Sequence, residues 1–249
     1  MSKRALITGS SSGIGFEYAK YLSKQDWDLD LVSQNQERSR HSKEKLSYSK
    51  ANFHTCDLGK KESIDLILND FKLPDLIVAN AGVAVNGEIG KLDVYEREYY
   101  YYLMCGGVID LIEGFLPKMI QKQSGRIVII SSIGAKTAMP KSALYSSIKS
   151  GIYSYGKSIS SELNNKNISV TVSLPGYVNT NAHKRAGLNH LKHKIPKWMW
   201  IEPYQVVNET ERASRLGKSE VIPGNIYKFT SPFLKYKPMM KIWKSLTKR

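Results

Sequence analysis

Short apolar runs alternate with longer amphipathic segments along the whole of this 249-residue chain. The apolar runs have the length of β-strands, and the segments between them have the length and periodicity of helices. Such alternation is typical of a parallel sheet whose two faces are covered by helices, so we predict an α/β fold with a doubly wound parallel sheet of about seven strands. The expected strands are residues 5–8, 28–33, 52–55, 75–79, 126–132, 168–174 and a short one near 221, and the main expected helices are residues 16–22, 60–71, 95–117, 142–163 and 203–216.

The composition is that of a globular protein, because 41% of the residues are hydrophobic and 24% are charged. At this length one large domain is expected, and no apolar run approaches the ~20 residues that a membrane-spanning helix needs. Met1-Ser-Lys-Arg4 leads directly into the first predicted strand, so we expect no signal peptide and a cytoplasmic protein. Cys56 and Cys105 lack the spacing of metal ligands, and we interpret both as packing residues.

The net charge of +15 is concentrated towards the C-terminus, where fifteen Lys or Arg stand against four Glu from His183 onward. Such an excess attracts phosphates, whether on a cofactor, on nucleic acid or on an anionic membrane surface. A solvated basic face without a specific partner is an equally good interpretation. The tail, residues 226–249, mixes apolar and basic residues, which suits membrane contact or packing on a second subunit. No recognised nucleic-acid module accompanies the charge, so we expect no nucleic acid as a partner.

A glycine-rich turn, Thr8-Gly-Ser-Ser-Ser-Gly-Ile-Gly15, follows the first predicted strand and opens into a helix. Glycines in this position allow a tight turn, close approach of the backbone to a pyrophosphate and close packing of the helix. The N-terminus of the helix then faces the anion. Glycine-rich connections occur in many folds, but the placement between strand and helix favours dinucleotide binding.

The end of the second predicted strand is where the adenosine ribose of a dinucleotide should lie. A site that prefers NAD places a carboxylate there, but this chain has Ser33-Gln-Asn-Gln36, and Asp28 and Asp30 come earlier in the strand. The residues that follow include four basic candidates for a 2′-phosphate, namely Arg38, Arg40, His41 and Lys43. We therefore expect NADP(H) to be preferred over NAD(H).

Tyr145 and Lys149 have the i, i+4 spacing that puts two side chains on one face of a helix. A tyrosine titrates near ~10, and a nearby positive charge favours its phenolate, which makes it a better acid or base at neutral pH. Such a pair is common on helix surfaces, so the spacing alone is weak evidence for catalysis. The context strengthens it, because a predicted strand ends in Ser131 and Ser132, thirteen residues before the tyrosine.

Together with Asn80-Ala-Gly82, which follows the fourth predicted strand, these features resemble the classical short-chain dehydrogenase/reductase family. The resemblance covers nearly the whole chain. It implies one Rossmann-type domain over residues 1–249 and reversible hydride transfer between NAD(P)(H) and a carbonyl or secondary alcohol. The expected parts are a mainly dinucleotide-binding half (1–90), a catalytic half (91–180), a substrate lid (181–201) and the basic tail (226–249).

The resemblance also implies roles for individual residues. Tyr145 would be the proton donor, Lys149 would lower its pKa and bind the ribose, and Ser132 would orient the carbonyl, with Ser131 as the fallback. Asp57 would lie against the adenine edge, although an aspartate that caps the next helix is an alternative. The other cofactor-binding residues that the resemblance implies are Gly9, Ser11, Ser12, Gly13, Ile14, Gly15, Gln34, Leu58, Asn80, Ala81, Gly82, Pro175, Gly176, Val178 and Thr180.

Three positions depart from the family pattern. An asparagine that supports a proton relay in the family is absent, and its place falls on Met104, whose thioether donates no hydrogen bond. Gln34 stands where an arginine usually marks NADP, and Ser12 stands where a basic residue is frequent in the glycine turn. The missing asparagine and the basic tail motivate a rival hypothesis, a dinucleotide-binding regulatory or membrane-associated scaffold protein with little or no turnover.

The predicted lid contains three histidines and two tryptophans, which are His183, His190, His193, Trp198 and Trp200. The histidines lack carboxylate or cysteine partners at ligand spacing, so we expect no metal site. The tryptophans are candidate apolar walls of a substrate pocket, and with the apolar tail they suggest a bulky or lipid-like carbonyl. The family resemblance further implies a homodimer or homotetramer, with the helix that carries four consecutive tyrosines, 99–102, at the contact.

Overall fold

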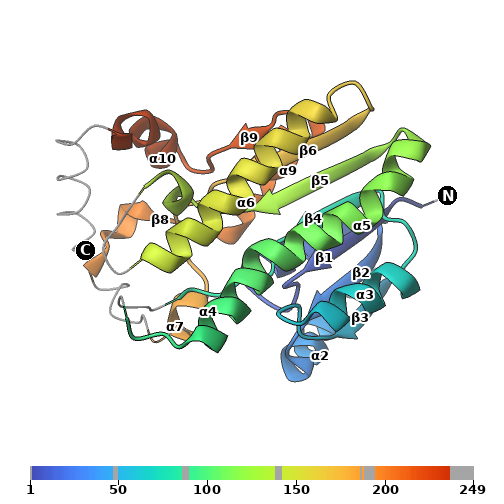
Figure 1. The fold of residues 1–249 in the computed structure, drawn as a ribbon, viewed down its shortest axis with the longest axis horizontal. Coiled ribbons are helices and arrows are strands. Elements are labelled where there is room, and N and C mark those ends of the chain that lie inside the picture. Colours follow the sequence, from blue (N-terminus) through green and yellow to red (C-terminus); the bar gives the residue numbers. More distant parts are fainter. Residues whose placement is uncertain are drawn as a thin grey trace.

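The computed structural model describes residues 2–46, 50–85, 90–137, 142–185, 187 and 194–235. Seven parallel strands form one sheet in the order β3-β2-β1-β4-β5-β6-β9, and the order reverses between β1 and β4 (Figure 1). This is the doubly wound sheet that the apolar runs predict. Its strands are β1 (Arg4–Thr8), β2 (Asp28–Ser33), β3 (Ala51–Thr55), β4 (Leu76–Ala79), β5 (Gly125–Ile130), β6 (Ile168–Ser173) and β9 (Glu220–Val221).

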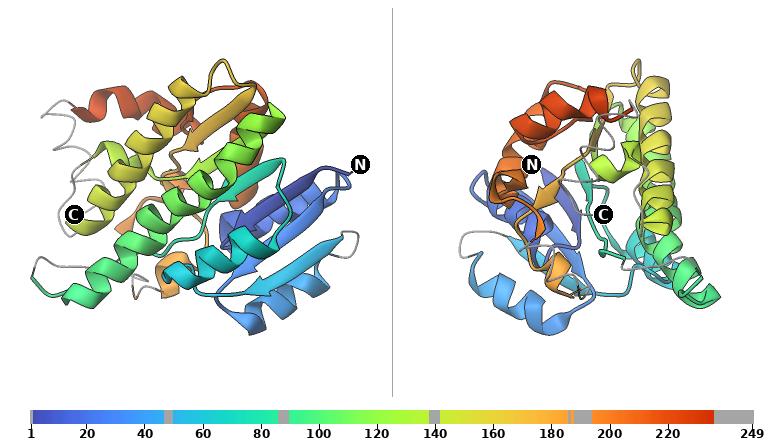
Figure 2. Two further views of the ribbon diagram at one scale, coloured as in Figure 1. Left: turned by 45° about the vertical axis from the view of Figure 1, so that its right-hand side comes forward. Right: turned by 90° about the vertical axis from the view of Figure 1, so that its left-hand side faces the viewer.

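Helices cover both faces of the sheet (Figure 1 and Figure 2). One face carries α3 (Lys61–Asp70), α5 (Gly107–Lys122) and α6 (Ala143–Glu162). The other face carries α1 (Gly13–Ser23) and α9 (Pro203–Arg215), while α2 (Gln36–Glu44) lies against β3. Helix α1 begins three residues earlier than predicted, because the last two glycines of the turn already belong to its first turn.

The alternation of side chains along each strand produces two cores, one on each face. In β5, Ile129 belongs to the cluster that contains Phe115 of α5, whereas its neighbour Val128 belongs to the cluster that contains Tyr18 of α1. A strand that is buried on both faces has no polar side to display. This explains why the strands read as continuous apolar runs in the sequence.

The helix predicted over residues 95–117 is interrupted. A π-helical turn, Tyr102–Gly106, separates α4 (Val94–Tyr101) from α5 and buries Met104 and Cys105. A Cβ atom at Gly107 would lie only 3.0 Å from the Tyr102 carbonyl oxygen, so a side chain there would crowd the widened turn. Hydrophobic periodicity does not reveal this turn, because its five residues are fewer than the roughly 11–18 over which the periodicity is judged.

A second sheet of two strands, β7 (Tyr177–Val178) and β8 (Trp200–Ile201), lies beyond β6 in the chain. The short helix α7 (Ala182–Arg185) follows β7, and α10 (Asn225–Thr230) follows β9. Tyr227 of α10 is fully buried, where its hydroxyl donates to the Met199 carbonyl and accepts from the Tyr177 amide. Most of the predicted tail, residues 236–249, lies outside the described residues. Within the described part of the chain, no helix combines the length and the apolar character needed to cross a membrane.

Charged residues at the amino end of the sheet are paired with one another. Glu211 of α9 is fully buried and lies 2.9 Å from both Arg126 and Arg215, and it accepts the Tyr18 hydroxyl at 2.8 Å. Burial, followed by the charge of Glu211, raises the pKa of the Tyr18 hydroxyl well above its usual value. This buried network joins α1, α9 and β5.

The acids of β2 also face this end of the molecule. Asp30 lies 2.9 Å from Arg4 and accepts a hydrogen bond from Asn52, and Asp28 lies 3.5 Å from the same arginine. Both carboxylates are therefore engaged with protein groups away from the carboxyl end of the strand.

Candidate active site

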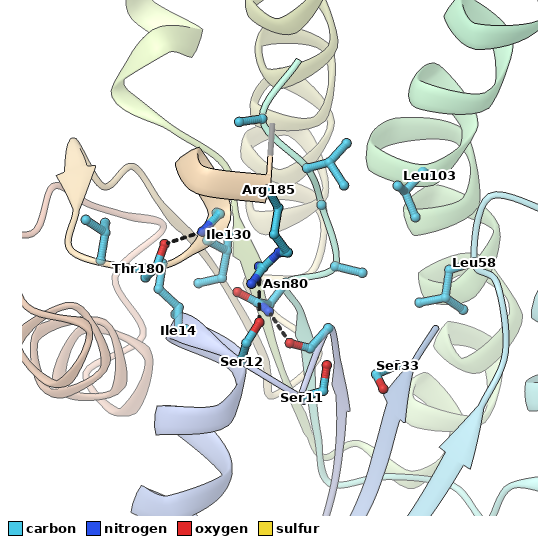
Figure 3. A pocket seen from close by; sticks show the side chains of 18 of the residues that line it. Ser11, Ser12, Ile14, Ser33, Leu58, Asn80, Leu103, Ile130, Thr180 and Arg185 are labelled. Atoms are coloured by element: carbon cyan, nitrogen blue, oxygen red, sulfur yellow. Dashed lines mark hydrogen bonds between the residues drawn. The ribbon is translucent and has the colours of Figure 1, made fainter. Parts of the chain in front are cut away.

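A cavity opens at the carboxyl ends of the parallel strands, lined by the segments that follow β1 to β6 (Figure 3). Open α/β sheets bind their ligands in this position, where the strand order reverses. Every predicted catalytic and cofactor-binding residue except Gly15 lines the cavity. A Cβ atom at Gly15 would collide with the Gly9 carbonyl oxygen, so this glycine allows α1 to pack beneath the turn.

The glycine turn has the backbone conformation that only glycine adopts without strain at two positions. Gly9 and Gly13 have φ angles of 64° and 58°, and a Cβ atom at Gly9 would lie 2.8 Å from the Ala81 Cα atom. Asn80 ties this turn to β4, because its side-chain amide donates to the carbonyl oxygens of Thr8 and Gly9 at 2.9 and 3.3 Å. The Thr8 hydroxyl in turn accepts the backbone amides of Asn80 and Ala81. The result is a turn that is held firmly against β4 and whose glycines present backbone to the cavity.

Asp57 lines the cavity, and one of its carboxylate oxygens is already engaged. That oxygen accepts the Gly59 amide at 3.0 Å and the Tyr99 hydroxyl at 2.9 Å. Burial, and then the hydrogen bond to Asp57, raises the pKa of Tyr99 to about 12. Asp57 therefore stabilises the loop that precedes α3 rather than the first turn of α3 itself, whose N-cap is Lys60.

The two serines that follow β5 have different environments. Ser131 is buried, and its hydroxyl donates to the Lys149 carbonyl oxygen at 2.9 Å, so it joins β5 to α6. The Ser132 hydroxyl oxygen accepts the Gly134 amide at 3.0 Å. A Cβ atom at Gly134 would lie 3.3 Å from this oxygen and 3.5 Å from the Tyr145 ring, so Ser132 and Tyr145, which both line the cavity, lie close to each other beside Gly134.

Lys149 lies one turn beyond Tyr145 on α6 and is 6% exposed. Its ammonium donates to the Ile130 carbonyl oxygen at 3.0 Å. Burial lowers the pKa of Lys149 to about 8. Burying a cation lowers the free energy of unfolding. A buried cation on the wall of a cavity is therefore a candidate for a role in binding or catalysis.

Arg38 is the one member of the basic group in α2 that lines the cavity. Its Nε atom is buried and has no hydrogen-bond partner, and its side chain forms no ion pair with the described residues. Arg40, on the same helix, is exposed. The sequence named Arg38 among four basic candidates but could not select it, because the selection depends on how α2 lies against the glycine turn.

Comparison with known proteins agrees with this geometry. The profile of the family described as short chain dehydrogenase matches residues 3–190. The chain belongs to the short-chain dehydrogenase family. It is 28% identical to the 3-oxoacyl-(acyl-carrier-protein) reductase FabG of Chlamydia muridarum over 191 residues, which cover 74% of this chain and 77% of that protein. It is 31% identical to the uncharacterized oxidoreductase YmfI of Bacillus subtilis over 218 residues, 84% of this chain and 90% of that protein.

The fold of this short-chain dehydrogenase matches solved structures over almost its whole length. A short-chain dehydrogenase from Sphingobium yanoikuyae in complex with NADPH superposes with a TM-score of 0.83, at 21% identity, covering 96% of this chain and 95% of the other. Family membership and the fold establish the reaction class. The protein is an oxidoreductase that transfers hydride between a nicotinamide cofactor and a carbonyl or secondary alcohol.

The position expected to hold the relay asparagine of the short-chain dehydrogenases is filled by Met104. This residue is buried in the π-helical turn, and a Cβ atom at Gly82 would lie 3.4 Å from its sulfur and 3.7 Å from the Lys149 ammonium. The thioether therefore lies beside the lysine without donating a hydrogen bond to anything around it. Lys149 instead has the Ile130 carbonyl as its partner.

The predicted lid is described only in part. Trp198 is 56% exposed, and Trp200 packs against Tyr177 with its indole N–H donating to the Ile195 carbonyl; neither tryptophan lines the cavity. The described residues of the cavity wall therefore do not include the two tryptophans that the sequence suggested, because β8 places Trp200 against Tyr177 and leaves Trp198 exposed. The His183 side chain and residues 188–193 lie outside the described residues. Among the described residues, no three His, Cys, Asp or Glu side chains cluster as metal ligands would.

Proposed function

We propose that this short-chain dehydrogenase reduces a carbonyl with NADPH, using Ser132, Tyr145 and Lys149 as its catalytic residues. The observation that carries the cofactor choice is Arg38, a half-buried arginine on the cavity wall whose buried Nε atom has no hydrogen-bond partner among the described residues. An anion from outside the protein would satisfy it. The 2′-phosphate of NADP is such an anion, and NAD lacks it.

The other end of the cofactor fits the glycine turn. A Cβ atom at Gly9 would collide with Ala81 and Asn80, and one at Gly13 would press on Thr180, so glycine is needed to keep this turn in place at the N-terminus of α1, where a pyrophosphate would bind. Gln34, at the end of β2, carries no charge to repel a phosphate. The two acids of β2, Asp28 and Asp30, are engaged by Arg4 and do not line the cavity.

The catalytic side chains have complementary tasks. When bound, the reduced nicotinamide supplies the hydride that the carbonyl carbon accepts. Tyr145 donates its hydroxyl proton to the carbonyl oxygen, and the Lys149 ammonium favours the resulting phenolate by its charge. Because the Ser132 oxygen already accepts the Gly134 amide, its hydroxyl hydrogen is available to the developing alkoxide.

Two groups of carbonyl compounds are the candidate substrates. One relative is named for 3-oxoacyl substrates on an acyl carrier protein, which supports a 3-oxoacyl thioester as the first carbonyl to assay. Bulky ketones form the second group, which the apolar residues of the tail, 226–249, suggest from the sequence alone. The rival hypothesis of a scaffold without turnover has less support, because the cavity holds the complete set of Ser132, Tyr145 and Lys149.

The proposal is tested by titrating the protein with NADPH and NADH and following the fluorescence of the bound nicotinamide. NADPH should bind about 10- to 100-fold more tightly than NADH, since one charged hydrogen-bonding partner contributes an effect of this size. Arg38→Ala should remove most of the difference, whereas Arg40→Ala, an equal loss of charge on the same helix, should keep it. Equal binding of both nucleotides by the unaltered protein would refute the NADPH preference.

We also propose that the protein forms a homo-oligomer through the face that contains α4. Tyr95 and Tyr101 of this helix are 78% and 53% exposed, and exposed aromatic residues are enriched in subunit interfaces. Sedimentation velocity measures the assembly directly, and a monomer at all concentrations would contradict this proposal.

A further inference from the structure

A second arginine reaches the cavity from a distant part of the chain. Arg185 ends α7, the short helix after β7, and its side chain lines the same cavity as Arg38. One of its terminal nitrogens donates to the Ser12 hydroxyl of the glycine turn at 3.2 Å (Figure 3). The Thr180 hydroxyl anchors the start of α7 by accepting the Ala182 amide at 3.3 Å. The guanidinium thus lies over the turn, at the residue where the turn itself carries no positive charge.

The charges around this point do not balance. Neither Arg38 nor Arg185 forms an ion pair with the described residues, and the one carboxylate that lines the cavity, Asp57, already accepts Tyr99 and Gly59. Partial burial, and then the charge of Arg38, lowers the pKa of the Arg185 guanidinium. The two cations are therefore close enough for electrostatic repulsion between them. Two arginines that remain charged beside one cavity favour a dianion between them.

We propose that Arg185 is the second arm of a phosphate clamp, so that the 2′-phosphate of NADP is held between Arg38 of α2 and Arg185 of α7. This proposal rests on the NADPH preference inferred above. It makes Arg185 a specificity residue for the cofactor, although it belongs to the segment expected to contact substrate. Binding of the phosphate then links the glycine turn to that segment, and NAD cannot provide this link.

The test compares the dissociation constants of NADPH and NADH in matched variants. Arg185→Ala should weaken NADPH binding about 10- to 100-fold and leave NADH nearly unchanged. Arg185→Lys should recover part of the loss, because an ammonium keeps the charge but not the forked geometry. Lys197→Ala removes the same charge from an exposed residue that does not line the cavity, and it should change neither constant.

Two nucleotide probes separate the phosphates of the cofactor without any catalysis. Competition by 2′,5′-ADP should weaken in Arg185→Ala, whereas competition by 5′-AMP should not. If NADH and 5′-AMP weaken as much as NADPH does, Arg185 binds the 5′-phosphates and the clamp is wrong.

A rescue variant tests the location of the guanidinium. Adding Ser12→Arg to Arg185→Ala restores a cation to the part of the glycine turn that Arg185 contacts, so the preference for NADPH over NADH should return. Failure of this proposal is distinguishable from failure of the NADPH preference. In the first case the unaltered protein prefers NADPH and only Arg185→Ala is without effect; in the second the unaltered protein has no preference to lose.

Discussion

Lysine and arginine side chains lie at both ends of the parallel sheet, but they differ in whether a carboxylate is paired with them. At the amino end, cations are matched with acids: Arg126 lies 2.9 Å from Glu211, and Lys122 lies 2.6 Å from Asp75. At the carboxyl end, Arg38 and Arg185 have no carboxylate among the described residues, and the Lys149 ammonium has only a carbonyl oxygen at 3.0 Å. Lysine and arginine are therefore neutralised by acids at the amino end, whereas the cations that line the cavity remain available.

The difference separates charges that serve the fold from charges that serve a ligand. The fold is strongly destabilised when one partner of a buried ion pair is removed, because the remaining buried charge has no opposite charge beside it. A cation without a protein partner at a cavity does not stabilise the fold, and its removal should cost function instead. Substitutions at the two ends should therefore affect different measurements.

The largest expected effect lies at the carboxyl end and concerns turnover. Tyr145→Phe should lower turnover by about 10²- to 10⁴-fold, because the proton donor is lost. Binding of NADPH should persist, since the glycine turn and Arg38 are untouched. Steady-state kinetics and nucleotide titration measure the two quantities separately.

The matched control for this variant is Tyr153→Phe, two turns further along α6. The Tyr153 hydroxyl binds Glu220 at 2.6 Å and does not line the cavity, so turnover should remain close to that of the unaltered protein. Undiminished turnover in Tyr145→Phe would remove this tyrosine from the mechanism.

The next effect lies at the amino end and concerns stability. Glu211→Ala should lower the free energy of unfolding by about 3–5 kcal/mol, because Arg126 and Tyr18 lose their buried partner. Urea unfolding measures the loss, and the folded fraction should bind NADPH normally. Glu209→Ala removes an acid from the same helix whose partner, Lys228, is half-exposed, so its cost should be about 1 kcal/mol or less. Equal costs for the two variants would show that burial of Glu211 contributes nothing.

The smallest effect is a pH dependence that originates at the carboxyl end. Burial lowers the pKa of Lys149 from 10.5 to about 8. Between these values the unfolded chain holds the proton and the folded protein does not, so the free energy of unfolding should rise with pH in this window, by about 3 kcal/mol at most. Below a pH of about 8 Lys149 is charged in both the folded and the unfolded protein, and the cost of burying that charge lowers the free energy of unfolding by its full amount.

Lys149→Met isolates this contribution, because methionine has a similar volume and does not titrate. Urea unfolding on both sides of the window should show a smaller rise in the variant than in the unaltered protein. An identical rise in both proteins would mean that Lys149 is not the buried cation that the structure describes.

Much of the fold could be predicted from the sequence, because it depends on local pattern. Strands buried on both faces, such as Ile127 to Ile130, must be apolar at every position, and helices between them must be amphipathic. The observed strands differ from the predicted ones by no more than two residues at any end. The sequence did not predict the π-helical turn at Met104, because its five residues are too few to change a periodicity judged over roughly 11–18 residues.

The sequence also determined the members of the cavity, since glycines at fixed spacing and the ends of parallel strands meet wherever such a sheet forms. Only the tertiary structure decided which charges are available there. Arg38 and Arg185 are 147 positions apart in the chain, and nothing in either segment indicates that both line one cavity. Whether a cation is paired depends on which carboxylates the fold brings within a few ångströms, and that is a property of packing rather than of local pattern.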